Sequence, residues 1–296
     1  MSVLSSTRGD PELLYAVLRL LQARGEPLAT TELRDWLQPG LERYPGSLLG
    51  DTLGVARSLG LVQSVGKSVE LTSEEPLDAI VQLADRVHLR LCTCTADDPD
   101  LVLYQTFAWF VVQCEKNGQT TQWIEGYSRR SDLADEIDQA LRTLRPDQDA
   151  RVFNDSKYAS WSNWLHFTGL ACDLGKSFGF YPFVYERLKR ELARVSHDLG
   201  LRKQLDLEIV LQEVARAMPY LDGGRIFADL SSALRWQQPP RKLTLVLSTA
   251  LRELHDLEEI ELVSKGDMAD AFALAEDRYS RVGFARWIVL KEGLFS

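Results

Sequence analysis

The sequence predicts a mainly α-helical protein with small β-wings, in which two winged helix-turn-helix modules flank a helical middle domain. Three observations support this prediction. Helix-spaced segments followed by a hairpin-like segment occur near the N-terminus, a similar order occurs near the C-terminus, and the stretch between them is helical by its spacing. A chain of 296 residues is long enough for two or three domains of roughly 100–150 residues each.

The N-terminal winged helix is predicted over residues 1–75. Its first helix should begin after Asp10, a suitable N-cap that is followed by Pro11, and should end at Gly25. The segments TTELRDWL and LLGDTLGVARSL predict a second and a third helix. The alternating segment LVQSVGKSVELT then predicts a two-stranded hairpin with Gly66 at its tip. Three helices followed by a ribbon is the order of a winged helix.

The middle domain is predicted over residues 76–200. Helical spacing occurs in LVLYQTFAWFVVQC, RRSDLADEIDQALRTL, SNWLHFTGLACDLG and YPFVYERLKRELARVSHDL. The stretch FNDSKYASWSNWLHFTGLACDLG, which contains the third of these segments, is rich in aromatic residues, which are common both in cores and at interface hot spots. We take Tyr158, Trp161 and Trp164 as candidate partner-binding residues, with a buried core position as the alternative for each.

The C-terminal winged helix is predicted over residues 201–296. The segments LEIVLQEVARAMPYL, IFADLSSALRW and LTLVLSTALRELHDL predict three helices. The segment EEIELVSKGDMADAFALA then predicts a strand, a turn and a second strand. The alternative is that both ends of the chain are unrelated helix-hairpin pieces that share no common module.

The charge of the chain opposes strong non-specific DNA binding. The formal net charge is −9. Residues 1–75 hold 7 basic against 10 acidic residues, and residues 201–296 hold 13 against 15, so neither predicted module is a basic domain. Binding to phosphate would therefore require a local basic patch. The N-terminus lacks a signal-peptide pattern, no apolar run could span a membrane, and four cysteines are too few for a disulfide scaffold. We expect a cytoplasmic protein that does not contact membranes.

The third helix of each module is the candidate DNA-reading helix, because that helix enters the major groove in winged-helix proteins. In the N-terminal module this helix carries Gly50, Asp51 and Gly54 at outward positions, where basic or amide side chains would be expected. The C-terminal module is the better candidate. The predicted DNA-binding residues are Arg43, Arg57 and Lys67 in the first module and Arg241, Lys242, Thr244, Ser248, Arg252 and Lys265 in the second.

No pattern of catalytic or ligand-binding residues is complete. Gly66-Lys67-Ser68 and Gly175-Lys176-Ser177 resemble the end of a phosphate-binding loop, but the upstream glycine is displaced by one residue in each case. His88, Cys92 and Cys94 could form a metal site, although buried free cysteines are the favoured interpretation. We therefore expect no catalytic activity, no metal and no cofactor.

Two stretches resemble a known family. The segment FNDSKYASWSNWLHFTGLA and the later segment LSTALRELHDLEEIELVSKGDMADAFAL resemble DpdG-type proteins, over the middle and C-terminal thirds of the chain. Those proteins belong to bacterial clusters that place 7-deazaguanine in DNA and restrict foreign DNA. The resemblance implies an accessory protein of phage defence that works beside nuclease and helicase partners. It transfers no functional residue, because no catalytic signature is part of it.

Three hypotheses for the function follow. The first is a non-enzymatic adaptor of a DNA-targeting defence complex, which docks partner proteins and contacts DNA weakly. The second is a winged-helix transcriptional regulator, which would act as a homodimer with its two reading helices about one DNA turn apart. The third is an enzyme whose catalytic residues are remote in sequence. The sequence leaves the partner, the DNA recognised and the oligomeric state open.

Overall fold

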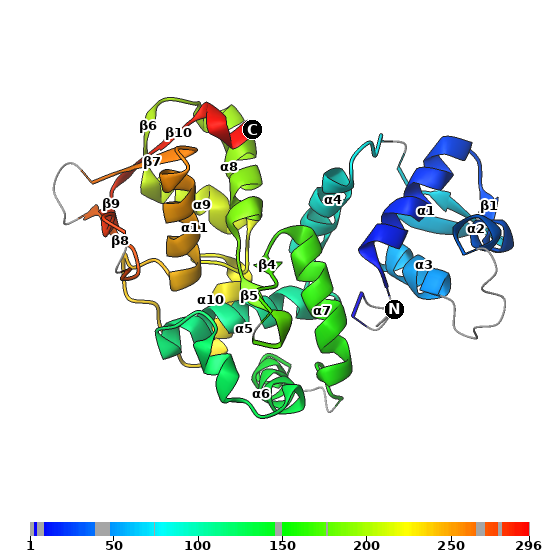
Figure 1. Ribbon diagram of the computed structural model, residues 1–296, viewed down its shortest axis with the longest axis horizontal. Coiled ribbons are helices and arrows are strands. Elements are labelled where there is room, and N and C mark those ends of the chain that lie inside the picture. The colour runs from blue at the N-terminus through cyan, green and yellow to red at the C-terminus, as the bar shows by residue number, and fades with distance from the viewer. Residues whose placement is uncertain are drawn as a thin grey trace. The chain divides into compact units, whose positions relative to one another are not determined.

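The computed structural model describes residues 3–4, 9–38, 48–73, 75–145, 150–175, 177–264, 270–277 and 280–295. These ranges contain eleven α-helices and four small antiparallel sheets (Figure 1), which confirms a mainly α-helical protein with small β-structures. The chain divides into two compact units. The first unit comprises Met1–Leu103 and Asp155–Thr168, and the second comprises Tyr104–Asn154 and Gly169–Ser296.

The first unit is built around a small sheet and the helices that pack on it. Its elements are α1 (Pro11–Arg24), β1 (Leu28–Ala29), α2 (Thr30–Leu37), α3 (Leu48–Ser58), β2 (Val62–Val65), β3 (Ser68–Leu71), α4 (Ile80–Cys92) and α7 (Asp155–Thr168). The predicted limits of α1 are confirmed. The side chain of Asp10 accepts hydrogen bonds from the first turn, and Gly25 ends the helix in the left-handed conformation with φ 66°.

The sheet of the first unit has the strand order β1-β3-β2. Strands β2 and β3 form the predicted hairpin, in which Val65 pairs with Ser68 across a two-residue turn. Gly66 adopts φ 60° at the tip, a conformation that favours glycine. Strand β1, which precedes α2, therefore pairs with the edge of β3 opposite to β2. Helices α1 and α3 pack on this sheet (Figure 1).

Helix α7 belongs to the first unit although it is remote in sequence. It packs against α4 and α1. Its side chains Tyr158, Trp161 and Trp164 are buried, and Trp161 donates a hydrogen bond from its indole nitrogen to the carbonyl of Leu103 at 3.0 Å. The two units are defined only by the contacts between their residues. The domain boundaries predicted at residues 75 and 200 therefore stay a prediction.

The second unit surrounds α5, whose residues from Tyr104 to Val112 are all buried. The ring of Phe110 lies 4.5 Å from that of Phe180, and Tyr104 lies 4.5 Å from Tyr220. Helix α5 spans Leu101–Asn117, and its first three residues are counted with the first unit. The other elements of the second unit are η1 (Gln122–Gly126), α6 (Arg130–Arg142), β4 (Ala171–Cys172), η2 (Ser177–Gly179), β5 (Tyr181–Pro182), α8 (Tyr185–Leu199), β6 (Gln204–Asp206), α9 (Leu207–Ala217), α10 (Arg225–Ala233), α11 (Leu245–Asp256), β7 (Ile260–Val263), β8 (Phe272–Ala273), β9 (Phe284–Ala285), β10 (Trp287–Leu290) and η4 (Glu292–Phe295).

One predicted strand pairing is wrong. The sequence suggested that the strand near Ile260 turns back at once and pairs with the next strand. Instead β7 pairs with β10, in the strand order β6-β10-β7, and β8 pairs with β9 in a separate ribbon. The reason is packing, because β10 buries Ile288 and Leu290 completely on the core side, whereas both residues of β8 stay only partly buried.

No helix within the described ranges combines the length and the apolar character that crossing a lipid bilayer requires.

Candidate functional site

Helix α3, the candidate reading helix of the first unit, has no open face at its centre. The five consecutive residues Thr52 to Ala56 are all buried. An α-helix turns once in about 3.6 residues, so five consecutive positions point in every direction around the axis. A helix that enters the major groove needs one exposed side. The middle of α3 is therefore closed to DNA in this conformation.

Asp100 holds the N-terminal residues Val3 and Leu4, which we call the cover, at the end of α3. Its carboxylate is 3% exposed and accepts two hydrogen bonds, from the backbone nitrogen of Val3 at 2.6 Å and from the hydroxyl of Ser58 at 2.5 Å. Val3 and Leu4 are themselves buried. One carboxylate thus joins the N-terminal segment, α3 and the segment that leads into α5.

The basic residues predicted to contact DNA in the first unit are few and scattered. Arg57 is exposed and donates a hydrogen bond from Nε to the hydroxyl of Ser64 at 3.0 Å. Lys67 is exposed at the hairpin turn, where its carbonyl accepts a hydrogen bond from the backbone nitrogen of Thr30 at 3.4 Å. Arg43 lies outside the described residues. Of the three residues predicted to contact DNA in this unit, Arg57 and Lys67 are therefore described and exposed.

Three of the residues predicted to read DNA from α11 are buried in the second unit. Thr244 caps the helix and donates to the carboxylate of Asp222 at 2.6 Å. The hydroxyl of Ser248 accepts the backbone N–H of Ala275 at 2.9 Å. Arg252, 5% exposed, donates from Nε to the carbonyl of Val282 at 3.1 Å. These side chains hold the fold together, because each polar atom named here is directed at another part of the unit.

The two exposed cations near the start of α11 have acidic partners. Arg241 lies 3.1 Å from the carboxylate of Glu208 and also donates to the carbonyl of Asp270 at 2.7 Å. Lys242 lies 3.9 Å from Glu115, whose carboxylate also accepts the backbone N–H at the first residue of α11. Burial raises the pKa of Glu115 above its ordinary value. Carboxylates therefore already occupy the positions at which a phosphate would meet these donors. Lys265 lies outside the described residues.

The more open side of α11 is acidic. Its half-exposed residues are Leu245, Thr249, Glu253 and His255, and the exposed Asp256 ends the helix. Burial is the main cause of the raised pKa of Glu253. The nearby carboxylates raise this pKa further, and Asp256 has the largest effect among them. A helix side with this charge repels the DNA backbone.

The aromatic residues predicted to bind a partner are buried. Trp161 and Trp164 have no exposed surface and Tyr158 is 1% exposed. The rings of Tyr158 and Trp161 lie 5.4 Å apart, and Trp164 meets Phe167 edge to face at 5.7 Å. Burial favours the alternative interpretation of these residues as core, since a partner could reach them only if the first unit opened.

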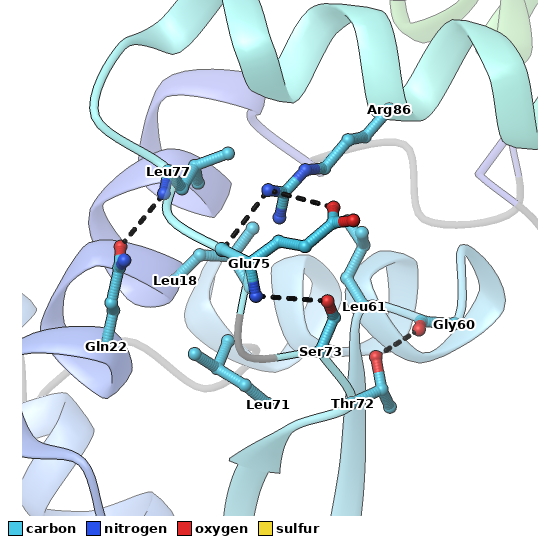
Figure 2. Close-up of a pocket in the computed structure, with 10 residues that line it drawn as sticks. All are labelled: Leu18, Gln22, Gly60, Leu61, Leu71, Thr72, Ser73, Glu75, Leu77 and Arg86. Carbon is cyan, nitrogen blue, oxygen red and sulfur yellow. Dashed lines mark hydrogen bonds and ion pairs between the residues drawn. The ribbon is translucent and has the colours of Figure 1, made fainter.

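A small pocket lies beside the hairpin of the first unit (Figure 2). Its volume is about 100 Å³. Arg86 closes one side by donating to the carbonyl of Pro76 at 2.8 Å and by pairing with the carboxylate of Glu75 at 3.3 Å. The residues that line it are Leu18, Gln22, Gly60, Leu61, Leu71, Thr72, Ser73, Glu75, Leu77 and Arg86. Pockets for drug-sized ligands and cofactors measure about 300–1,000 Å³, so this pocket is too small for a nucleotide.

The three residues of the conceivable metal site, His88, Cys92 and Cys94, make different local contacts. His88 Nε2 lies 3.5 Å from the sulfur of Cys92. The thiol of Cys94 instead contacts Arg90, with 3.7 Å between its sulfur and the guanidinium. Within the described ranges no three His, Cys, Asp or Glu residues are arranged so that they could hold a metal ion. The three residues of the conceivable metal site therefore divide between two different local contacts.

A comparison with known protein families identifies a family for this chain. The family model described as DpdG-like matches residues 1–268. Neither a curated protein nor a solved structure is significantly similar to the chain.

Proposed function

The chain belongs to the DpdG-like family, and we propose that it serves the Dpd DNA-modification system as a non-enzymatic adaptor. Family membership suggests the role in that system. In our proposal the protein docks the nuclease and helicase type components of the associated restriction machinery. Contact with DNA is weak and does not use α3 or α11 as a reading helix.

The arrangement of strands supports the proposal that both ends of the chain are winged-helix modules. In the first sheet, β1 follows α1 and pairs with β3, which also pairs with β2, the strand after α3. In the second sheet, β6 follows α8 and pairs with β10, which also pairs with β7, the strand after α11. Helix α1 packs on α3 in the first sheet's module, and α8 packs on α11 in the other. By this correspondence the second module begins at α8, upstream of the boundary predicted at residue 200.

The single observation that carries the adaptor proposal is that neither third helix offers a basic face to DNA. The centre of α3 is buried on all sides, and Thr244, Ser248 and Arg252 of the α11 region are bonded inward. A winged helix that cannot present its third helix to DNA remains a stable platform with loops, strand edges and helix ends for protein contacts. The acidic side of α11 favours a protein partner over a nucleic acid for the same reason.

The state of the buried thiols supports a non-enzymatic role. Burial raises the pKa of Cys94 and of Cys114 to about 12. A thiol with such a pKa is almost entirely protonated at neutral pH and is a poor nucleophile. The small pocket beside the hairpin is also lined mainly by leucines and by polar atoms that bond to the protein itself.

Pairwise binding measurements test the adaptor proposal. The purified protein would be titrated with each of the other purified proteins encoded in the same Dpd cluster, using interferometry, and its mass would be measured alone by light scattering. We expect at least one stable complex in the absence of DNA. If none of these proteins binds, or if a complex forms only when DNA is present, the proposal is refuted.

A second candidate function is transcriptional regulation, which the winged-helix strand order itself favours. A regulator of this kind would be a homodimer in solution and would bind one duplex sequence far better than random DNA. The same light-scattering measurement, combined with selection of bound duplexes from a random pool, separates the two functions.

A further inference from the structure

The small pocket of the first unit has apolar walls that come from four separate parts of the chain. Leu18 lies in α1 and Leu61 directly precedes β2. Leu71 ends β3, and Leu77 lies between β3 and α4. The volume of the pocket is about 100 Å³, and an apolar cavity of about 150 Å³ is large enough to bind benzene. The small pocket therefore has room for one aliphatic side chain of about the size of leucine.

Hydroxyl groups around the small pocket bond to the protein itself (Figure 2). The hydroxyl of Thr72 donates to the carbonyl of Gly60 at 2.5 Å, and the hydroxyl of Ser73 accepts the backbone N–H of Glu75 at 3.2 Å. Water that enters the pocket therefore competes with these bonds or faces leucine side chains. An apolar group gains affinity when it displaces such poorly held water. The pocket is thus suited to an apolar side chain rather than to a polar one.

Arg86 supplies polar donors at one side of the small pocket. Its Nη2 atom donates to the carbonyls of Glu75 at 3.2 Å and of Pro76 at 2.8 Å, and lies 3.3 Å from the carboxylate of Glu75. Within the described ranges, the Nε and Nη1 atoms of Arg86 donate to no acceptor. A guanidinium carries five N–H donors in a fixed fork. The remaining donors fit a neutral acceptor such as a backbone carbonyl, because Glu75 already balances the charge.

The outer charges at the rim of the small pocket are carboxylates. Arg86 pairs with Glu75, and Arg19 pairs at 3.3 Å with Asp78, the residue that follows the pocket residue Leu77. The side chains of Glu75 and Asp78 are 76% and 72% exposed, whereas those of Arg86 and Arg19 are only 28% and 44% exposed. A partner that approaches the pocket therefore meets the carboxylates first. Lysine and arginine complement such a rim.

We propose that the small pocket binds one leucine-sized side chain of a partner protein, in a segment where lysine or arginine flanks that residue. The aliphatic side chain fills the pocket, and a backbone carbonyl beside it accepts a hydrogen bond from Arg86. The flanking cations lie near Glu75 and Asp78. Single apolar anchors that fill a pocket are typical of interface hot spots. DNA and anionic lipid surfaces are disfavoured, because the outer carboxylates repel their phosphates.

The inference rests on the proposed adaptor function, because it locates the place where the adaptor holds its partner. The test uses the full-length protein and the purified proteins of the same Dpd cluster. Ser73→Leu is the central variant, since Ser73 is exposed and lines the pocket, so the added side chain blocks the pocket without entering the core. Arg86→Met keeps an apolar stem and removes the N–H donors. Ser64→Leu is the matched control, because Ser64 is an exposed serine of β2 that does not line the pocket.

We expect Ser73→Leu and Arg86→Met each to weaken binding of the partner by at least about tenfold, and Ser64→Leu to have no effect. Glu75→Gln should reduce the salt dependence of binding. If a cluster protein binds the wild type and both pocket variants equally, the pocket is not the docking site, while the adaptor function stands. Self-association that Ser73→Leu abolishes would make the occupant a second copy and would overturn the proposed partner.

A peptide probe tests the small pocket without any cluster protein. The capped peptides acetyl-Lys-Leu-Lys-amide and acetyl-Lys-Ser-Lys-amide would each be titrated into the full-length protein, and the methyl signals of Leu18, Leu61 and Leu71 would be followed by NMR. We expect the leucine peptide to shift these signals and the serine peptide to leave them in place. Equal shifts with both peptides, or no shift with either, would overturn the inference. If no cluster protein binds the wild type, the adaptor function itself fails, and the peptide result still decides whether the pocket binds leucine.

Discussion

Replacing Asp100 by alanine should uncover α3. The carboxylate accepts hydrogen bonds from the backbone of Val3 and the hydroxyl of Ser58, and both bonds are made by a charged acceptor away from solvent. Each hydrogen bond to a charged group contributes about 1.5–3 kcal/mol, and the desolvation of the buried carboxylate offsets part of the sum. We therefore expect Asp100→Ala to lower the free energy of opening this cover by about 2–4 kcal/mol.

Hydrogen exchange measures this opening directly. A loss of about 2–4 kcal/mol speeds exchange by about 30- to 1,000-fold at amides that become free when the cover opens. Those amides are the backbone groups of Val3 and Leu4. The amides in the middle of α3 are bonded within the helix, so their exchange should speed up only as far as the uncovered helix unfolds locally. Asp100→Asn keeps one acceptor oxygen and should produce an intermediate effect, and Ser58→Ala removes only one of the two bonds. A graded series in this order is expected.

An exchange pattern at Val3, Leu4 and α3 that is unchanged in Asp100→Ala would contradict this expectation. In that case the burial of α3 would not depend on the cover that Asp100 ties down. Even an uncovered α3 should not bind DNA, because Arg57 is the only basic residue within the helix. Gain of tight duplex binding by the variant would contradict the account equally.

Three further variants test other parts of the structure. Trp164→Ala should destabilise the first unit by about 3–5 kcal/mol in urea unfolding, because the residue is fully buried; a stable variant that only loses partner binding would restore it as a surface residue. Gly224→Ala should destabilise the second unit by about 3 kcal/mol or more, because the new Cβ would lie 2.4 Å from the carbonyl oxygen of Pro219, whereas Gly283→Ala, which meets no atom, should be neutral by the same measurement. Glu115→Gln should flatten the pH dependence of unfolding. Because the pKa of Glu115 is raised in the folded protein, its contribution to stability is complete below the ordinary pKa of 4.5 and is lost as the pH rises through the pKa of the folded state. Urea midpoints should therefore fall less between pH 4.5 and 7 in the variant than in the wild type. An equal fall in both proteins would show that Glu115 is not responsible.

Local elements were predictable because their signals are local. Asp10 and Gly25 mark the ends of α1 through capping, and Gly66 marks the hairpin through its positive φ. The pairing of β7 with β10 was not predictable in the same way. A nearby strand-like segment competes for the same position, and only the burial of Ile288 and Leu290 decides between them.

The candidate site was harder to predict because function here depends on what covers a helix. Asp100 stands in the acidic segment TADDPD, where it resembles a solvated residue, yet it is 3% exposed and bonded to Val3. Arg252 resembles a DNA-contacting residue by its position in α11, but it donates to carbonyl groups inside its own unit. Burial of a polar residue against a remote segment leaves no signal in local spacing.

Binding to duplex DNA shows whether either third helix reads DNA. The purified full-length protein would be titrated into a labelled random duplex at about 50 mM and 200 mM salt, the range over which phosphate contacts lose most of their affinity. We expect no saturable binding by the protein alone at the higher salt and at most weak binding at the lower. Tight binding that falls steeply with salt, and that protects α3 or α11 from hydrogen exchange, would contradict it.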